Sequence, residues 1–119
     1  MIRLEPWNDL AEHAIARIEG ACVVDIRHEV RAGISQLWHC IDAEGHRGYV
    51  VTRLEERESG REWVLVAGVG KGFHVFVQTF IEAARCAGLP LRAHVNRRGM
   101  VRMYEHVGFH VSEYVVRKP

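Results

Sequence analysis

The apolar positions between residues 73 and 84 recur with the period of an α-helix. The stripe consists of Phe73, Phe76, Val77, Phe80, Ile81 and Ala84. These positions stand at i, i+3, i+4, i+7, i+8 and i+11, which places them on one face of a helix. Gly88 follows the last apolar turn and Pro90 stands just beyond it, as is typical of a helix end. The sequence therefore predicts a long amphipathic helix over residues 73–88.

Before this helix, the apolar positions and the turn residues favour three β-strands. The expected strands are residues 36–41, 48–54 and 62–67. The turn at residues 42–46 contains Gly45, and the turn at residues 58–60 ends in Gly60, so both have the composition of hairpin connections. The pattern predicts a three-stranded antiparallel meander. Its last strand alternates little between apolar and polar positions, so we expect helices or chain to cover both of its faces.

The remaining elements are shorter. A first helix is expected from a cap at Asn8 or Asp9 to about Glu19, before Gly20. Residues 22–34 fit a strand or a helix, and their charge spacing favours a short helix. We further expect a strand at 91–95, a helix that ends at Gly108 and a strand at 109–117. This order predicts one α+β domain over residues 1–119 with a mixed, mostly antiparallel sheet and the long helix laid across it.

A glycine-rich segment joins the third strand to the long helix. The connection from residues 62–67 through that helix to 91–95 is long enough for a βαβ crossover, so these two strands are expected to run parallel. At their carboxyl ends, where ligands bind, Gly68, Gly70 and Gly72 alternate before the helix. Exposed amides, the helix N-terminus and Lys71 favour a phosphate there. A flexible connection that is merely rich in glycine is the alternative interpretation.

This segment differs from the two common glycine-rich phosphate motifs. Lys71 is followed by Gly72 and Phe73, so the Gly-x4-Gly-Lys-Ser/Thr pattern of P-loop NTPases is absent. Phe73 also occupies the position of the last glycine in the dinucleotide-binding fingerprint. Neither class of nucleotide-binding protein is therefore predicted.

The net charge and the apolar runs of the chain limit the classes of protein to which it can belong. The chain has 16 Lys and Arg residues against 15 Asp and Glu residues, a formal net charge of +1, so any attraction for an anion must be local. No apolar run approaches the ~18 residues of a membrane-spanning helix. Residues 1–6 lack the apolar core of a signal peptide. We therefore expect a cytoplasmic protein that does not contact membranes.

The cysteines and histidines point to no metal site and no disulfide. Cys22, Cys40 and Cys86 are odd in number and form no CxxC pair, so each is interpreted as a small buried hydrophobic residue. The HExxH zinc motif is absent. The prediction is a protein without resident metal.

Two segments carry a more specific signal. Residues 67–72 fit the pattern Arg/Gln-x-x-Gly-x-Gly/Ala at both glycine positions, Gly70 and Gly72, but have Ala67 in the first position. Farther on, Asn96 precedes a Tyr-x-x-x-Gly-Phe segment that begins at Tyr104. Through these motifs and the order of its elements, the chain resembles the GNAT superfamily of acyl-coenzyme A-dependent N-acetyltransferases from about residue 7 onward.

The resemblance implies a fold and a set of contacts. Strands 62–67 and 91–95 would splay apart and admit the pantetheine arm of acetyl-coenzyme A or another acyl-coenzyme A. The pyrophosphate would rest on amides around residues 69–72. The implied cofactor-binding residues are Val66, Ala67, Val69, Gly70, Lys71, Gly72 and Asn96. An amine acceptor would attack the thioester directly.

The resemblance also implies a catalytic role for Tyr104, which would protonate the departing thiolate. A tyrosine with a pKa of ~10 can transfer a proton to a thiolate whose thiol has a pKa of ~8.5 once the thiolate forms. Because Tyr104 lies on the apolar stripe of its helix, a tyrosine at the edge of the core is the alternative interpretation. Glu55, Glu62 and His74 are candidate general bases, and the sequence does not choose among them.

The start of the chain and the basic stretch near its end leave alternatives open. Few residues precede the first helix, so we expect the family's first strand to be clipped or missing, and the acceptor side to be open or completed by a second subunit in a homodimer. The chain could also be a GNAT-like binding or assembly module without turnover. A nucleic-acid contact through the arginines of residues 92–102 is the weakest hypothesis.

Overall fold

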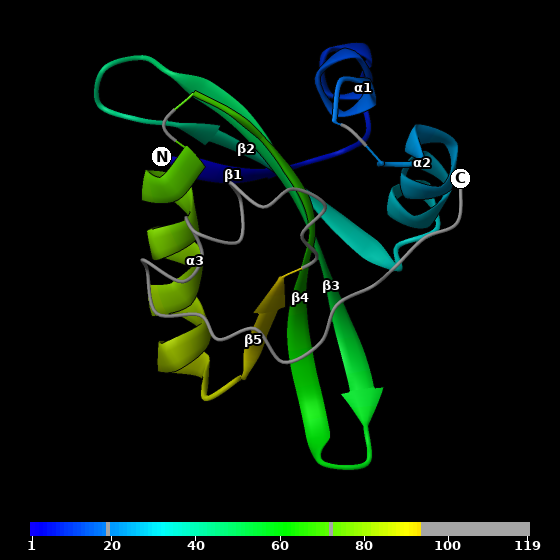
Figure 1. The fold of residues 1–119 in the computed structure, drawn as a ribbon, viewed down its shortest axis with the longest axis vertical. Helices are drawn as coiled ribbons and strands as arrows, with labels where there is room; N and C mark the ends of the chain where they lie inside the picture. The colour runs from blue at the N-terminus through cyan, green and yellow to red at the C-terminus, as the bar shows by residue number, and fades with distance from the viewer. Residues whose placement is uncertain (19, 72, 94–119) are drawn as a thin grey trace.

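The computed structural model describes residues 1–18, 20–71 and 73–93. In chain order the elements of this part are β1 (Ile2–Glu5), α1 (Asp9–Ala16), α2 (Val23–Arg31), β2 (Ser35–Ile41), β3 (Arg47–Arg57), β4 (Gly60–Gly70), α3 (Phe73–Ala87) and β5 (Leu91–Ala93). Figure 1 shows a mixed sheet with α3 on one side and α1 and α2 on the other. The α+β class, the two N-terminal helices, the meander and the long helix are confirmed.

The sheet has five strands in the order β1-β2-β3-β4-β5. β1 to β4 pair antiparallel, whereas β4 and β5 are parallel, with Trp63 opposite Leu91 and Leu65 opposite Ala93. The predicted crossover through the long helix is therefore present. The predicted last helix and closing strand, with Asn96 and Tyr104, lie outside the described residues, as do Gly72 and the last two residues of the strand expected at 91–95.

The two faces of the sheet carry separate apolar cores. On one face, Phe76, Val77 and Phe80 of α3 pack with Val50 and Leu65. The ring of Phe80 makes T-shaped contacts with two indoles, and its centroid lies 5.9 Å from that of Trp38 and 5.5 Å from that of Trp63. On the other face the buried residues are Ala11, Ile15, Ile26, Leu37, Tyr49 and Val51. The covering of β4 on both faces agrees with the weak alternation of its sequence.

Local sequence explains the helix ends. The Asn8 side chain accepts a hydrogen bond of 2.9 Å from the Ala11 N–H, so Asn8 is the N-cap of α1. α1 ends at Ala16, earlier than expected.

Of the three cysteines, Cys40 is buried, and burial raises its pKa to about 12. Cys22 and Cys86 are exposed, so their interpretation as buried hydrophobic residues is wrong.

The structure places β1 where the sequence predicts no strand. Ile2–Glu5 is a strand of four residues that pairs antiparallel with β2, so a short strand does precede the first helix. The Glu5 carboxylate holds this short strand: its Oε1 accepts from Arg3 at 2.8 Å and lies 3.1 Å from His39 Nδ1. Its Oε2 accepts from the Asn8 amide at 3.3 Å. One carboxylate thus joins β1, β2 and the start of α1.

The ionisation of Glu5 makes this junction dependent on pH. Burial works to raise the Glu5 pKa, but hydrogen bonds from Arg3 and His39 outweigh it and hold the pKa below its ordinary value. A lowered pKa in the folded chain stabilises it above the unfolded value of ~4.3, and this stabilisation is lost as the pH falls through the folded value. We expect Glu5→Gln to lower the free energy of unfolding by about 1 kcal/mol at pH 7.

Urea unfolding at pH 7 and pH 3 measures this effect. The difference between the wild type and Glu5→Gln should be smaller at pH 3 than at pH 7, because the wild-type carboxyl group takes up protons as the pH falls toward its lowered pKa. Glu58→Gln, at an exposed position in the β3–β4 turn, is the control and should match the wild type at both pH values. A Glu5→Gln difference that is equal at the two pH values would contradict the role of the charge.

Candidate functional site

The middle of β4 contains a β-bulge. Val51 of β3 lies opposite Ala67, whereas the next residue, Thr52, lies opposite Leu65. Val66 is therefore an extra residue on β4 without a partner of its own on β3. Val66 and Ala67 both pack against the core under α1 and α2, while Leu65 packs under α3. The bulge thus turns two successive side chains to one face.

The bulge follows the last described pair between β4 and β5. That pair is Leu65 with Ala93, and the Trp63 N–H donates to the Pro90 carbonyl at 2.9 Å before the pairing begins. From Val66 to Gly70, β4 pairs with β3 along one edge. No described strand pairs with its other edge over those residues. The described strands therefore pair this stretch of β4 along one edge.

The glycines of this segment do not form the predicted loop. Gly68 lies opposite Val50 and Gly70 opposite Gly48, so both belong to β4. A Cβ at Gly68 would overlap the ring of Phe73. Gly70 has φ of +144°, and a Cβ there would lie 2.6 Å from the Gly48 Cα. Close packing, rather than a flexible connection, therefore requires these two glycines.

The predicted cofactor residues lie in two places. Val66, Ala67, Val69 and Gly70 are half-buried strand residues on β4, and Lys71 is exposed immediately after it. In a strand, alternate amides point to opposite edges. Only one of the two successive amides of Val69 and Gly70 therefore points away from β3. Lys71 stands between β4 and the N-terminal turn of α3, where its charge adds to the helix dipole.

Two of the candidate general bases are held by arginines. Glu55 and Glu62 are cross-strand partners toward the β3–β4 turn. Arg92 Nη2 lies 2.8 Å from Glu55, and Arg92 Nε lies 3.0 Å from Glu62. Arg53 Nη2 also lies 2.6 Å from Glu55. Both carboxylates are thus already engaged in ion pairs with arginines, so Glu55 and Glu62 are poor candidates for a base that must contact the substrate.

The same contacts change the interpretation of Arg92. Its side chain, 20% exposed, bridges carboxylates of β3 and β4 rather than presenting a free cation. The proposed nucleic-acid contact thereby loses the one arginine of residues 92–102 that the structure describes. The third candidate base, His74, is exposed in the first turn of α3, next to the segment that carries Lys71.

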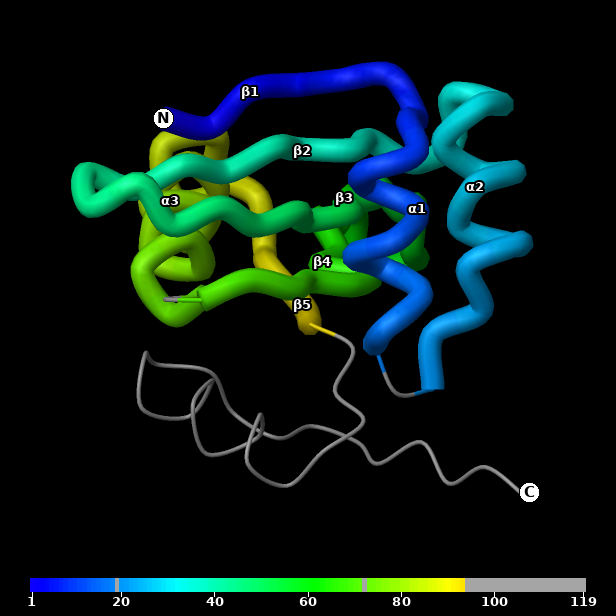
Figure 2. The backbone as a smooth tube through the Cα atoms, turned by 90° about the horizontal axis from the view of Figure 1, so that it is seen from above, coloured from blue at the N-terminus to red at the C-terminus, as the bar shows by residue number. Residues whose placement is uncertain are grey.

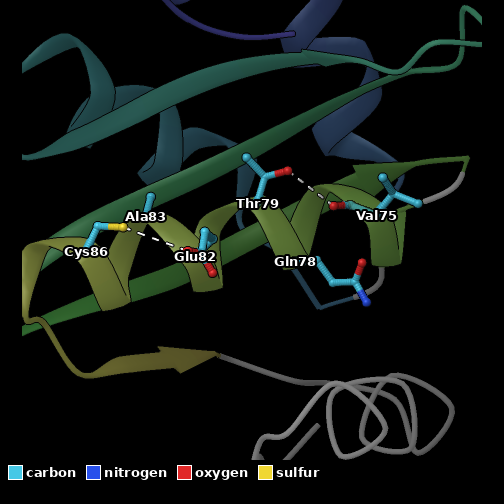
Figure 3. A pocket seen from close by; sticks show the side chains of 6 residues that line it. All are labelled: Val75, Gln78, Thr79, Glu82, Ala83 and Cys86. Atoms are coloured by element: carbon cyan, nitrogen blue, oxygen red, sulfur yellow. Dashed lines mark hydrogen bonds between the residues drawn. The ribbon is translucent and has the colours of Figure 1, made fainter.

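A shallow groove of about 530 Å³ runs along α3 (Figure 3). Its lining residues are Val75, Gln78, Thr79, Glu82, Ala83 and Cys86. All of them come from one helix, and the residues of α3 that face the sheet, such as Val77 and Phe80, lie on its other side. The side chains in this groove do not converge on a point, so the groove is a weaker candidate site than the edge of β4.

Within residues 1–18, 20–71 and 73–93, no three His, Cys, Asp or Glu side chains are grouped so that they could hold a metal ion. None of the helices in this part of the chain is long and apolar enough to cross a membrane.

Comparisons with known proteins show the fold alone. No protein-family model matches the chain, and no curated protein sequence matches it. The crystal structure of a point mutant of TTHA1254 from Thermus thermophilus is similar, with a TM-score of 0.59, 16% identity, and coverage of 98% of this chain and 95% of that chain. The wild-type structure of TTHA1254 gives a TM-score of 0.58 with the same identity and coverage.

The contact between Gly68 and Phe73 leads to a stability prediction. Gly68→Ala should lower the free energy of unfolding by about 1–3 kcal/mol, because the added methyl group overlaps the Phe73 ring. Adding Phe73→Leu to Gly68→Ala should recover part of that loss, because the smaller side chain makes room. Urea unfolding of both single variants and the double variant measures the coupling. Purely additive effects would show that this contact does not require the glycine.

Proposed function

We propose that the chain is a GNAT-like N-acyltransferase that binds an acyl-coenzyme A along the edge of β4 beyond Leu65. The observation that carries the proposal is the bulge at Val66, placed directly after the last described pair between the parallel strands β4 and β5. The motifs at residues 67–72 and 96–109 support the same family. The fold shared with TTHA1254 does not bear on activity, because a fold can serve many chemistries.

The backbone of β4 suits a ligand built of amides. The pantetheine arm has amide N–H and C=O groups spaced like those of a peptide, so it can bond to a strand edge as a further strand would. A bulge leaves backbone groups outside the ladder. An N–H at the bulge could donate to the thioester carbonyl as negative charge develops on its oxygen. Val66 and Ala67 would serve this end of the ligand.

The other end of the ligand is a diphosphate, which needs positive charge. Lys71 supplies a full charge, and the start of α3 supplies the positive end of a helix dipole. Because the whole chain carries a net charge of only +1, this local charge matters more than the general field. Val69, Gly70 and Gly72 would contribute backbone contacts on either side of Lys71, and Asn96 would add a side-chain contact.

The reaction follows from the chemistry of a thioester. The neutral amine nitrogen attacks the carbonyl carbon and forms the C–N bond, the C–S bond breaks, and the sulfur leaves as a thiolate. The nitrogen loses one proton to a base or to water, and Tyr104 would return a proton to the sulfur. The ion pairs of Glu55 and Glu62 argue for water or for His74 as the first proton acceptor.

A second candidate function is a GNAT-like binding module without turnover. The engagement of Glu55 and Glu62 by arginines favours it, as does Ala67 at the position where the family pattern has Arg or Gln. Such a module would keep the backbone contacts to coenzyme A, because these do not depend on a base. The two candidates therefore differ in turnover and not in binding.

Binding is tested by calorimetry with acetyl-coenzyme A. Lys71→Ala should weaken binding by about tenfold, because it removes one charge-assisted contact to a phosphate. Arg61→Ala removes another exposed cation, at the β3–β4 turn, and should leave the affinity within twofold of the wild type. If the wild type gives neither heat nor a thermal shift at millimolar ligand, both candidate functions are excluded, since a bound ligand must stabilise the folded state.

Turnover is tested by release of free thiol from acetyl-coenzyme A with a panel of amines. The transferase proposal expects an amine-dependent rate that Tyr104→Phe lowers at least tenfold, because the variant cannot donate a proton to the thiolate. The affinity for coenzyme A should stay within threefold. Binding of acetyl-coenzyme A without release of thiol by any amine would favour the module.

A further inference from the structure

Within the described residues, the outer edge of β1 has no strand partner. β1 is the first strand in the sheet order and pairs with β2 alone (Figure 2). The Ile41 N–H donates to the Met1 carbonyl at 2.8 Å, so alternation of the antiparallel ladder turns the backbone groups of Arg3 and Glu5 toward β2. The N–H and C=O groups of Ile2 and Leu4 therefore point away from the sheet. The described part of the chain places no strand against them.

Apolar side chains accompany this edge. Met1 is 75% exposed and Leu4 is 58% exposed, although both are large hydrophobic residues. Ile2 packs against the core under α3, so Leu4, two residues along the strand, stands on the same face. Arg3 and Glu5 stand on the opposite face, where Arg3 is 56% exposed at its side chain. An open edge beside exposed apolar side chains favours pairing with another strand.

We propose that a second copy of this chain pairs with this edge, β1 against β1, about a two-fold axis through Leu4. In this register Leu4 lies opposite Leu4 of the second copy, and Arg3 lies opposite Glu5 of the second copy. The outward N–H and C=O of Leu4 bond to their counterparts, and the Ile2 N–H donates to the Pro6 carbonyl of the second copy. Two five-stranded sheets become one continuous sheet.

The charges of the side chains favour pairing about Leu4 over pairing about Arg3. Pairing about Arg3 would make the same number of backbone hydrogen bonds, but it would place two Arg3 side chains directly opposite each other. Like charges in that position destabilise a strand pair, whereas opposite charges stabilise it. Pairing about Leu4 brings each Arg3 to a Glu5 and joins the two exposed leucines. The Arg-Leu-Glu order of β1 is thus complementary to itself.

The dimer leaves the candidate cofactor site uncovered. β1 and β4 are separated by β2 and β3, so a partner on β1 does not reach the edge of β4. This inference therefore does not depend on the proposed function. A contact between two strands of four residues belongs with the smallest specific interfaces, below about 1,200 Å². We expect a reversible dimer that forms between about 10 µM and about 1 mM protein.

Sedimentation equilibrium of the full chain over that range of concentration tests the dimer. Leu4→Pro should weaken it more than tenfold, because proline removes the outward N–H while leaving the ladder to β2 intact. Leu4→Lys should weaken it as well. Leu10→Lys changes another exposed leucine, on α1 and 71% exposed, and should leave self-association within twofold of the wild type. A wild type that is monomeric throughout, or an equal loss in Leu10→Lys, would overturn the proposal.

Amide hydrogen exchange on the wild type gives a second measurement that needs no variant. The amides of Arg3 and Glu5 bond within the chain and should be protected at every concentration. Protection of the Ile2 and Leu4 amides should appear only as the protein concentration rises. Self-association without protection at Ile2 and Leu4 would place the interface elsewhere and overturn the proposed pairing.

Discussion

The described part of the fold depends on the register of β4. This strand pairs antiparallel with β3 and parallel with β5, and its two faces meet different helices. The bulge at Val66 shifts the alternation of side chains by one residue. With strict alternation from Leu65, Val69 would face α3. With the bulge, Gly68 faces α3 and accommodates the Phe73 ring, while Val69 joins the core under α1. The bulge at Val66 and the glycine at position 68 therefore act together to accommodate the Phe73 ring.

Elements with a strong pattern could be predicted from the sequence, and those fixed by contacts could not. The period of 3.6 residues from Phe73 to Ala84 and the glycine turns of the meander identify their elements without further information. β1 has too few residues to show a period, and Pro6 directly after it suggests a loop. Pairing with β2 and the contact of Glu5 with His39, far along the chain, hold it instead. The end of β4 was missed for a different reason: glycine is rare in strands unless another group approaches closely.

In the candidate site, too, features set by neighbours along the chain could be predicted and features set by long-range contacts could not. The position of Lys71 before a helix could be read directly from the sequence, because it depends on neighbours along the chain. The pairing of Glu55 and Glu62 with Arg92 could not, since it joins three strands through a register that only the folded sheet defines. Sequence reasoning therefore proposed bases whose charges the fold already uses. The bulge was missed as well, because Val66 alone gives no signal in a run of apolar residues.

The two ends of β4 differ in the polar groups that they present, and the proposed ligand site makes use of this difference. Near the β3–β4 turn, side chains of opposite charge neutralise one another across β3, β4 and β5. Beyond the bulge, β4 consists of apolar residues and glycines, so its polarity is that of the backbone. Backbone groups at a strand edge need hydrogen-bond partners, which a strand, a ligand or water can supply. A ligand with amide groups and a diphosphate would supply partners to this edge and to Lys71, and it would encounter no carboxylate on the strand between Val66 and Gly70.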